Sequence, residues 1–157
     1  MGKLDLTVEP GTQVITFSRV FDAPIEKVFK AYVDPEAIKQ WWGGRTYGTK
    51  IDKHEPMAGG SWRYLQAGPD GKDYGFHGVF HEVTPNKRIM WTFEFEGLPE
   101  TGHVSLETVD FVDVSGKTKM VAQSVFRSVE NRDGMVQSGM EKGLSEGLDV
   151  LAELVEG

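Results

Sequence analysis

The chain has 157 residues, of which 39% are hydrophobic, 11% aromatic and 26% charged. A chain of this length buries roughly 68–70% of the surface that it exposes when unfolded, and this composition excludes disordered and fibrous proteins. The formal net charge of −7 disfavours nucleic acid and anionic membrane surfaces as partners. The absence of cysteine excludes disulfides, thiolate nucleophiles and thiolate metal sites. We therefore expect a single domain over residues 1–157, with its core between about 13 and 156.

The first residues carry no long apolar stretch of the kind that a signal peptide needs. Leu6 stands where a myristoylation motif requires Ser or Thr. The longest apolar runs are only a few residues long, far below the ~20 of a membrane-spanning helix. These features predict a cytoplasmic protein that does not associate with membranes.

Residues 13–21 alternate between polar and apolar side chains with the period of a strand, the more apolar set facing inward. The run Asp22-Ala23-Pro24 then predicts the start of a short helix, because proline suits the first helical turn. Asp34-Pro35-Glu36 repeats the signal and predicts a second short helix, which ends at Gly43-Gly44. Two short helices therefore interrupt the sheet after its first strand.

Alternating polarity and turn residues predict six further strands in the middle of the chain. They cover residues 47–55, 61–67, 74–83, 87–96, 103–114 and 118–128. Because the connections are as short as hairpin loops, we expect an antiparallel sheet. The register of 74–83 stays open, with either Phe76 or His77 facing inward.

Residues 131–156 change to the period of a helix, and their apolar side chains fall within about 120° of its circumference. These side chains are Val136, Met140, Leu144, Leu148, Leu151, Leu154 and Val155. The pattern predicts one long amphipathic helix whose apolar face lies on the sheet. The fold class is therefore α+β: a curved antiparallel sheet of about seven strands that grips a long C-terminal helix.

Short motifs follow one another along the chain in an order known from one superfamily. They are Ala23-Pro24 before a short helix, Asp34-Pro35-Glu36 leading to Trp41-Trp42, Gly59-Gly60 opening a strand, the run from Gly78 to Ile89, and Gly116-Lys117-Thr118-Lys119-Met120. This set spans about Val14 to Val155. It resembles the helix-grip (START-like, SRPBCC) superfamily, most closely the branch homologous to the activator of the ninety-kilodalton heat-shock-protein ATPase.

The resemblance implies a cavity between the sheet and the long helix, which most members of the superfamily share. Leu144 departs from the pattern, because the family commonly carries Trp after the glycine that corresponds to Gly143. The loss of that ring enlarges or reshapes the space beneath the helix. Members of the superfamily include lipid carriers, hormone binders, cyclases and co-chaperone domains, so the fold alone does not assign an activity.

Three glycines, Gly139, Gly143 and Gly147, lie at a spacing of four inside the predicted helix. Relative to alanine they cost about 3 kcal/mol of helix propensity, so a compensating role is expected. They either allow another backbone to approach closely, which is the more common reason, or leave room for a ligand.

Aromatic side chains share one face of several predicted strands and could wall the cavity. The predicted ligand-binding residues are Trp62, Tyr64, Phe76, Trp91 and Phe93 on the strands, and Met140, Gly143 and Leu144 on the helix. The alternative is that most of these rings fill a dry core. Of Trp41 and Trp42, one could close the cavity mouth, although packing of both in the core is the more common arrangement.

The four histidines do not predict a metal site. On a strand, His77 and His81 lie about 13–14 Å apart and cannot share one ion. His54 and His103 are distant from them in sequence. We therefore expect surface or lightly buried histidines and no bound metal.

The chain contains none of the motifs of nucleophilic hydrolases, zinc proteases or phosphate-binding loops. No catalytic residue is assigned and no cofactor is expected. Arg63, His77 and Glu107 could be acid–base groups if they faced inward. Because charged side chains are seldom buried without a partner, we expect all three to be exposed.

Three functions remain open. We favour a binding module for an apolar small molecule, for instance a lipid, in the sheet–helix cavity, since aromatic walls are expected and no catalytic motif is found. The second is a cofactor-free enzyme, cyclase- or hydrolase-like, that positions a hydrophobic small molecule beside a few polar groups. The third, implied by the resemblance, is a chaperone-regulating interaction protein, which the lack of the extra N-terminal domain of the true co-chaperones disfavours. A homodimer also stays open.

Overall fold

A computed structural model gives the structure of residues 2–157, within which the chain forms eight strands and four helices. In chain order they are β1 (Asp5–Val8), β2 (Val14–Phe21), α1 (Ile25–Val33), α2 (Pro35–Trp41), β3 (Gly48–His54), β4 (Ser61–Ala67), β5 (Asp73–Thr84), β6 (Arg88–Phe95), β7 (Ser105–Val114), β8 (Lys117–Val125), α3 (Val129–Gln137) and α4 (Met140–Glu156).

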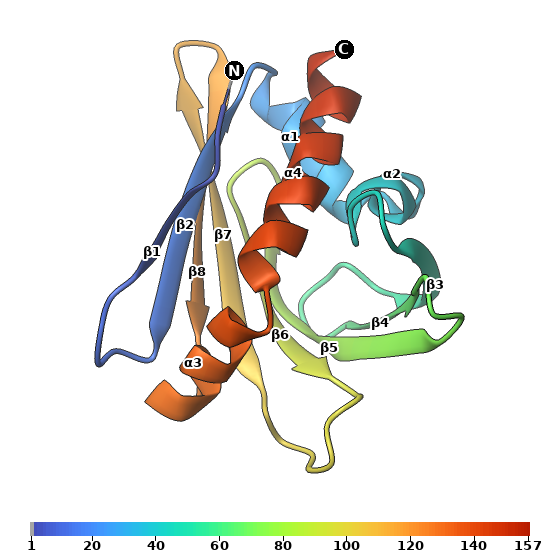
Figure 1. Cartoon of the computed structure of the whole chain (residues 1–157). Coiled ribbons are helices and arrows are strands. Elements are labelled where there is room, and N and C mark those ends of the chain that lie inside the picture. The colour runs from blue at the N-terminus through green and yellow to red at the C-terminus, as the bar shows by residue number, and fades with distance from the viewer. Residues whose placement is uncertain (1) are drawn as a thin grey trace.

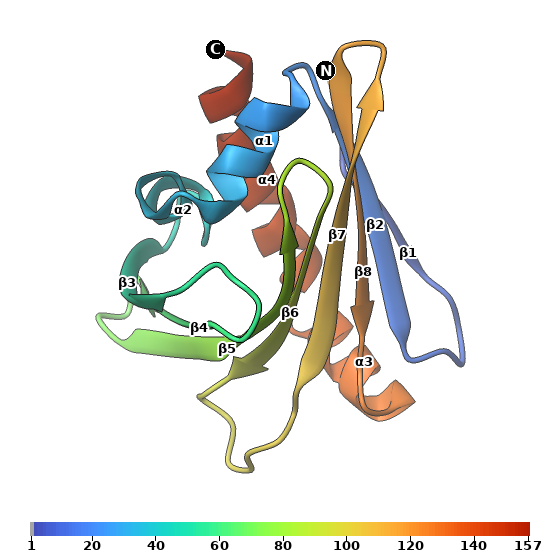
Figure 2. The same cartoon turned by 180° about the vertical axis from the view of Figure 1, so that it is seen from behind.

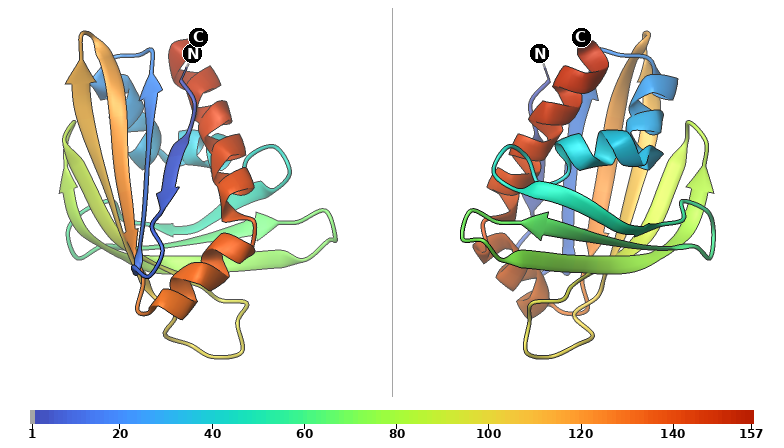
Figure 3. Two further views of the ribbon diagram at one scale, coloured as in Figure 1. Left: turned by 60° about the vertical axis from the view of Figure 1, so that its left-hand side comes forward. Right: turned by 90° about the vertical axis from the view of Figure 1, so that its right-hand side faces the viewer.

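The strands form one antiparallel sheet in the order β1-β2-β8-β7-β6-β5-β4-β3. The sheet is curved, and α4 lies across its concave side (Figure 3). Figures 1 and 2 show α1 and α2 beside the C-terminal half of α4, while α3 lies at the opposite end of the sheet. The expected α+β fold, with a curved sheet around a C-terminal helix, is confirmed.

The sheet has one more strand than the sequence predicts. β1 pairs with β2 along its whole length, from Asp5 opposite Ser18 to Val8 opposite Ile15. It has only four residues, of which Leu6 and Val8 are half-buried. Two alternating apolar residues are too few to stand out as a strand pattern in a sequence.

The prediction of one unbroken helix over 131–156 is wrong at Gly139. α3 ends at Gln137 with Ser138 as its C-cap, and Gly139 adopts φ 86°, a left-handed conformation that stops the helical path before α4 begins. The hydroxyl of Ser128 caps the start of α3 by accepting a hydrogen bond from the backbone N–H of Asn131, at 3.0 Å. The apolar period continues on both sides of the break, which hides it in the sequence.

A buried arginine fastens α3 to the edge of the sheet. Arg132 donates hydrogen bonds to the backbone oxygen of Glu9, at 2.6 Å, and to the hydroxyl of Thr12, at 3.1 Å. The same side chain is paired with Asp133 at 2.8 Å. These bonds hold α3 across the end of the sheet, where it closes one side of the cavity described below.

The core fills the end of the interface where α1, α2 and α4 meet the sheet. Its fully buried side chains include Phe21, Val28, Ile38, Ile89, Met120, Leu148 and Leu151. Trp41 belongs to this core, and its indole N–H donates to the backbone oxygen of Ala31 at 2.8 Å. The apolar α4 residues expected to face the sheet do so in two different surroundings. Leu148 and Leu151 are in this core, whereas Met140 and Leu144 face a cavity.

The sequence left undecided which side chains of 74–83 face inward, and in the structure the inward-facing set changes at a β-bulge in β5. Phe76 and Phe80 face the interior, while His77 faces outward. The pairing with β6 then shifts between Phe80 and Glu82, which inserts one extra residue into β5. After the bulge Val83 packs against the core, so neither of the two alternating sets faces inward throughout.

Candidate functional site

A cavity with two adjoining chambers lies between the sheet and the C-terminal helices. The inner chamber, of about 370 Å³, is bounded by β2, α1, the end of α2, β5–β8 and the N-terminal half of α4. The outer chamber, of about 610 Å³, is bounded by β5, β6, the β6–β7 loop and α3. Both chambers touch a common set of residues, which includes Tyr47, Gln66, Phe76, Phe93, Ser105, Phe126, Met135 and Ser138.

Six of the predicted ligand-binding residues lie on the wall of the inner chamber. They are Phe76, Trp91 and Phe93 on the strands, and Met140, Gly143 and Leu144 on α4. The rings of Phe76 and Phe93 have centroids 5.5 Å apart and form a continuous aromatic surface with Phe95, whose centroid is 5.1 Å from that of Phe76. Binding by these residues stays a prediction.

The other two predicted residues, Trp62 and Tyr64, do not line either chamber. Both are buried and border a void of about 40 Å³ behind Trp42, and Trp62 also borders a hollow on the outer face of β4–β6. The ring of Trp42 lies edge-on to Tyr64 and Phe76, at centroid distances of 5.2 and 5.1 Å. Trp42, which the sequence left between core packing and the cavity mouth, therefore separates the core aromatics from the chamber and itself lines it.

Each of the three glycines at the helix has a different environment. Gly139 supplies the left-handed turn between α3 and α4. A Cβ at Gly143 would meet nothing within 4 Å, whereas a Cβ at Gly147 would lie 2.9 Å from the backbone oxygen of Trp41. Gly147 therefore allows the backbone of α4 to approach that of Trp41 closely, which is the role that we favoured for the glycines. Gly143 instead borders open space.

The inner chamber contains a carboxylate, Glu107, which was predicted from the sequence to be exposed. Glu107 points inward from β7, and that expectation is wrong. The hydroxyl of Ser105 donates to one carboxylate oxygen at 2.6 Å, and the hydroxyl of Ser124 donates to the other at 2.5 Å. Burial raises the pKa of Glu107, and the two hydroxyl groups partly offset this by stabilising its charge. Glu107 lies on the same face of β7 as the buried residues Val109 and Phe111, and this alternation in the sequence could have predicted that it points inward.

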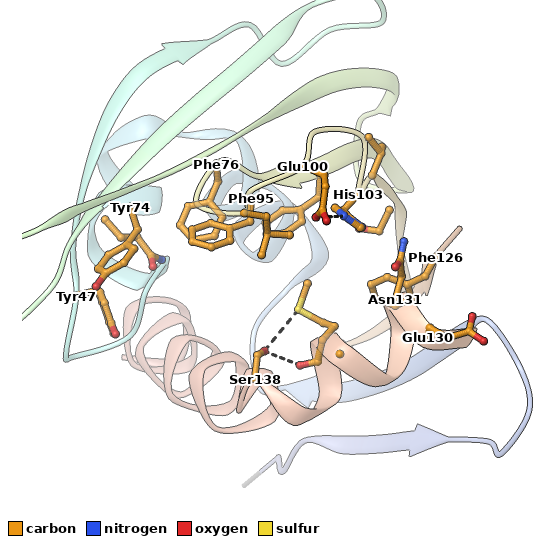
Figure 4. Close-up of a pocket in the computed structure, with 17 residues that line it drawn as sticks. Tyr47, Tyr74, Phe76, Phe95, Glu100, His103, Phe126, Glu130, Asn131 and Ser138 are labelled. Atoms are coloured by element: carbon orange, nitrogen blue, oxygen red, sulfur yellow. Dashed lines mark hydrogen bonds and ion pairs between the residues drawn. The ribbon is translucent and has the colours of Figure 1, made fainter. Parts of the chain in front are cut away.

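The outer chamber has a more polar rim. Figure 4 shows Glu100 and His103 on one side, paired at 3.2 Å, and Glu130 and Asn131 of α3 on another. The hydroxyl of Ser138 donates to the backbone oxygen of Met135 at 2.6 Å. A molecule in this cavity would therefore have its apolar part inside and polar groups near the rim.

The remaining candidate acid–base residues lie on the outer face of the sheet, as expected. Arg63 donates to Glu96 at 2.8 Å and to Asp52 at 3.2 Å, and His77 lies 2.9 Å from Glu96. Hydrogen bonding to Arg63 is the main reason that the pKa of Glu96 is lowered to about 2. This network binds the strands to one another at the surface and does not border either chamber.

The histidines lie apart in the structure. His54 bonds to the backbone oxygen of Val33 at 2.7 Å and to the hydroxyl of Tyr64 at 2.8 Å, while His81 is exposed at the bulge. Among residues 2–157 no three His, Asp or Glu side chains are grouped so that they could hold a metal ion. In the same part of the chain, no helix has the length and apolar character needed to span a membrane.

The family model described as "Activator of Hsp90 ATPase homolog 1-like protein" matches residues 22–156. The chain belongs to this family. Membership agrees with the helix-grip architecture and with the cavity between sheet and helix, a fold suited to ligand binding. Among curated proteins, none matches the chain significantly.

The chain is also similar to solved structures over nearly its whole length. A protein of Rhizobium leguminosarum is 30% identical with a TM-score of 0.67, and the match covers 99% of this chain and 98% of that one. A protein of Arthrobacter aurescens has a TM-score of 0.88 at 24% identity, covering 97% and 91%. A Rhodobacter sphaeroides protein has a TM-score of 0.87 at 24% identity, covering 98% and 99%. The last two likenesses concern the fold alone.

Proposed function

We propose that the protein binds an apolar small molecule in the inner chamber. The observation that carries this proposal is a space of about 370 Å³ whose wall is formed largely by aromatic and aliphatic side chains. Ligand sites are typically concave, mostly apolar and of roughly 300–1,000 Å³, with a few polar groups that orient the ligand. The chamber has this size and composition.

The position of the chamber also favours binding over a dry core. The wall residues Met140 and Leu144 are half-buried, although they lie on the face of α4 that is directed at the sheet. The same face of the same helix is fully buried one and two turns further on. Apolar side chains that face inward yet remain accessible are what a ligand would cover.

A cofactor-free enzyme is the second candidate, and one observation favours it. Glu107 is a carboxyl group of raised pKa inside the cavity, and such groups are common among catalytic acids and bases. Within the described part of the chain, however, the inner chamber offers no His, Lys or Arg that could act as its acid–base partner. Binding therefore remains the function that the geometry supports best.

A chaperone-regulating role is left as an alternative that the family name alone suggests. No residue of the cavity argues for it, because that role requires an external surface rather than a chamber.

The proposal is tested with a neutral naphthalene-type dye whose emission rises in apolar surroundings. We expect saturable binding to the wild-type protein, and weaker binding to Leu144→Trp because the added ring occupies the chamber. Leu106→Trp is the matched control, since Leu106 faces outward from β7 and the added ring is the same.

Absence of saturable dye binding by the wild-type protein would contradict the proposal, as would an equal loss in the two variants. Native mass spectrometry of freshly purified protein, which would detect a small molecule retained from the cell, gives an independent measurement.

A further inference from the structure

Glu107 is held in a fixed orientation at the inner chamber. It lies on β7 directly opposite Ser124 of β8, and Ser105 is on the same face of its own strand. The hydroxyl groups donate to different carboxylate oxygens, at 2.6 and 2.5 Å, and this fixes the side chain in place. When ionised, the carboxylate keeps further acceptor capacity that is available to a ligand in the chamber.

Within residues 2–157, no cationic side chain is paired with this carboxylate. Among the described residues of the inner chamber, the other ionisable side chains are Tyr32 and Tyr47, and neither can carry a positive charge. The two buried arginines are bound elsewhere: Arg19 is paired with Asp149 at 2.6 Å, and Arg132 bonds to the β1–β2 loop. Because an unpaired buried charge is costly, a positive charge brought by a ligand would be strongly favoured here.

The surroundings of Glu107 suit the rest of such a ligand. Trp91 lies directly opposite Glu107 across the β6–β7 pair, and both side chains line the chamber. Phe93 and Trp42 add further aromatic faces. Aromatic faces attract cations as well as apolar groups, with about 0.5–2 kcal/mol for a well-placed ring.

We propose that the inner chamber binds a hydrophobic amine, with its protonated nitrogen at the carboxylate of Glu107 and its apolar body against Trp91, Phe93 and Leu144. This deepens the proposed function and rests on it. A hydrophobic acid is excluded from the same place by repulsion from Glu107. A neutral molecule of the same shape gains the apolar contacts but not the charge pairing.

The test uses three naphthalene probes of nearly the same size: 1-naphthylmethylamine, the neutral 1-naphthalenemethanol, and the anionic 1-naphthoate. Their dissociation constants are measured by isothermal titration calorimetry at neutral pH. For the wild-type protein we expect the amine to bind about tenfold or more tightly than the alcohol, and the carboxylate most weakly.

Glu107→Gln should remove the preference for the amine by about the same factor while leaving the affinity for the alcohol within about twofold. Glu141→Gln is the control, because it removes the same charge from an exposed position at the start of α4. It should leave all three affinities unchanged. A thermal melt of Glu107→Gln that is no lower than that of the wild type shows that the variant is folded.

Equal affinity of the wild type for amine and alcohol overturns the inference but leaves the proposed function standing. Unchanged amine binding by a folded Glu107→Gln variant does the same. If the wild-type protein binds none of the three probes, the proposed function fails and the inference fails with it.

Discussion

The two halves of α4 meet the sheet in different ways. In the C-terminal half, Leu148 and Leu151 are 0% exposed and lie in a continuous core with residues of α1, α2 and the strands. In the N-terminal half, Met140 and Leu144 border the inner chamber. The comparison indicates that α4 contributes most to stability at its packed end, while its hollow end borders the space in which we propose that a ligand binds.

The largest expected effect is a loss of stability at the packed end. Leu148→Ala should lower the free energy of unfolding by about 2–5 kcal/mol, because it leaves a cavity in a fully buried site. Leu144→Ala removes the same atoms beside an existing chamber, so fewer contacts are lost and the cost should be clearly smaller. Urea denaturation of both variants measures the difference, and equal losses would show that the two halves are packed alike.

The packed end was the easier half to predict from the sequence. Its α4 residues follow the helical period, and β4 was predicted with the bounds that it has in the structure, Ser61–Ala67. The prediction of secondary structure failed where the backbone departs from a regular helix or strand. Gly139 breaks the helix without interrupting the apolar period, and the bulge in β5 changes which side chains face inward partway along one strand.

The hollow end depends on contacts between distant segments, which a sequence pattern does not contain. Trp62 and Tyr64 have the parity of cavity residues, but Trp42, which directly follows α2, covers them. Glu107 has the parity of a buried residue, but its chemistry argued for exposure until its neighbours Ser105 and Ser124 were known. At these positions the alternation along the strand predicts whether a side chain points inward. It does not predict which residue from another segment will lie against that side chain.

Two glycines of α4 allow a test of the comparison with the same substitution. Gly147→Ala places a Cβ 2.9 Å from the backbone oxygen of Trp41, so α2 or α4 must shift. We expect a loss of about 1–3 kcal/mol in spite of the better helix propensity of alanine. Gly143→Ala meets nothing within 4 Å and should gain up to about 1 kcal/mol.

Urea denaturation of the two alanine variants measures both changes. Opposite signs would support a boundary between packed and hollow halves that lies between residues 143 and 147. A stabilised Gly147→Ala variant would mean that the contact between α2 and α4 is loose, and that the packed end begins closer to the C-terminus.

The smallest change in stability is expected from Glu107→Gln, which keeps the shape of the side chain and removes its charge at the hollow end. Burial raises the pKa of Glu107 in the folded protein above its unfolded value. Folding is therefore favoured by this group below the unfolded pKa, and that advantage is lost as the pH rises through the folded pKa. At neutral pH the wild type bears the cost of a buried charge, so Glu107→Gln should melt at a higher temperature.

Below about pH 4 the wild-type carboxyl is protonated in both states, and the difference between the two melting temperatures should disappear. Among residues 2–157, the other titratable side chains that line the inner chamber are Tyr32 and Tyr47, and burial raises the pKa of Tyr32 further. Carboxylates elsewhere, such as Glu96 with its pKa of about 2, titrate alike in both proteins and cancel in the difference. A difference that persists unchanged at acid pH would show that the charge of Glu107 is not what destabilises the hollow end. If the chamber binds a cation, as we propose, the charge of Glu107 should lower the melting temperature of the empty protein. An amine bound in the chamber should raise the melting temperature again.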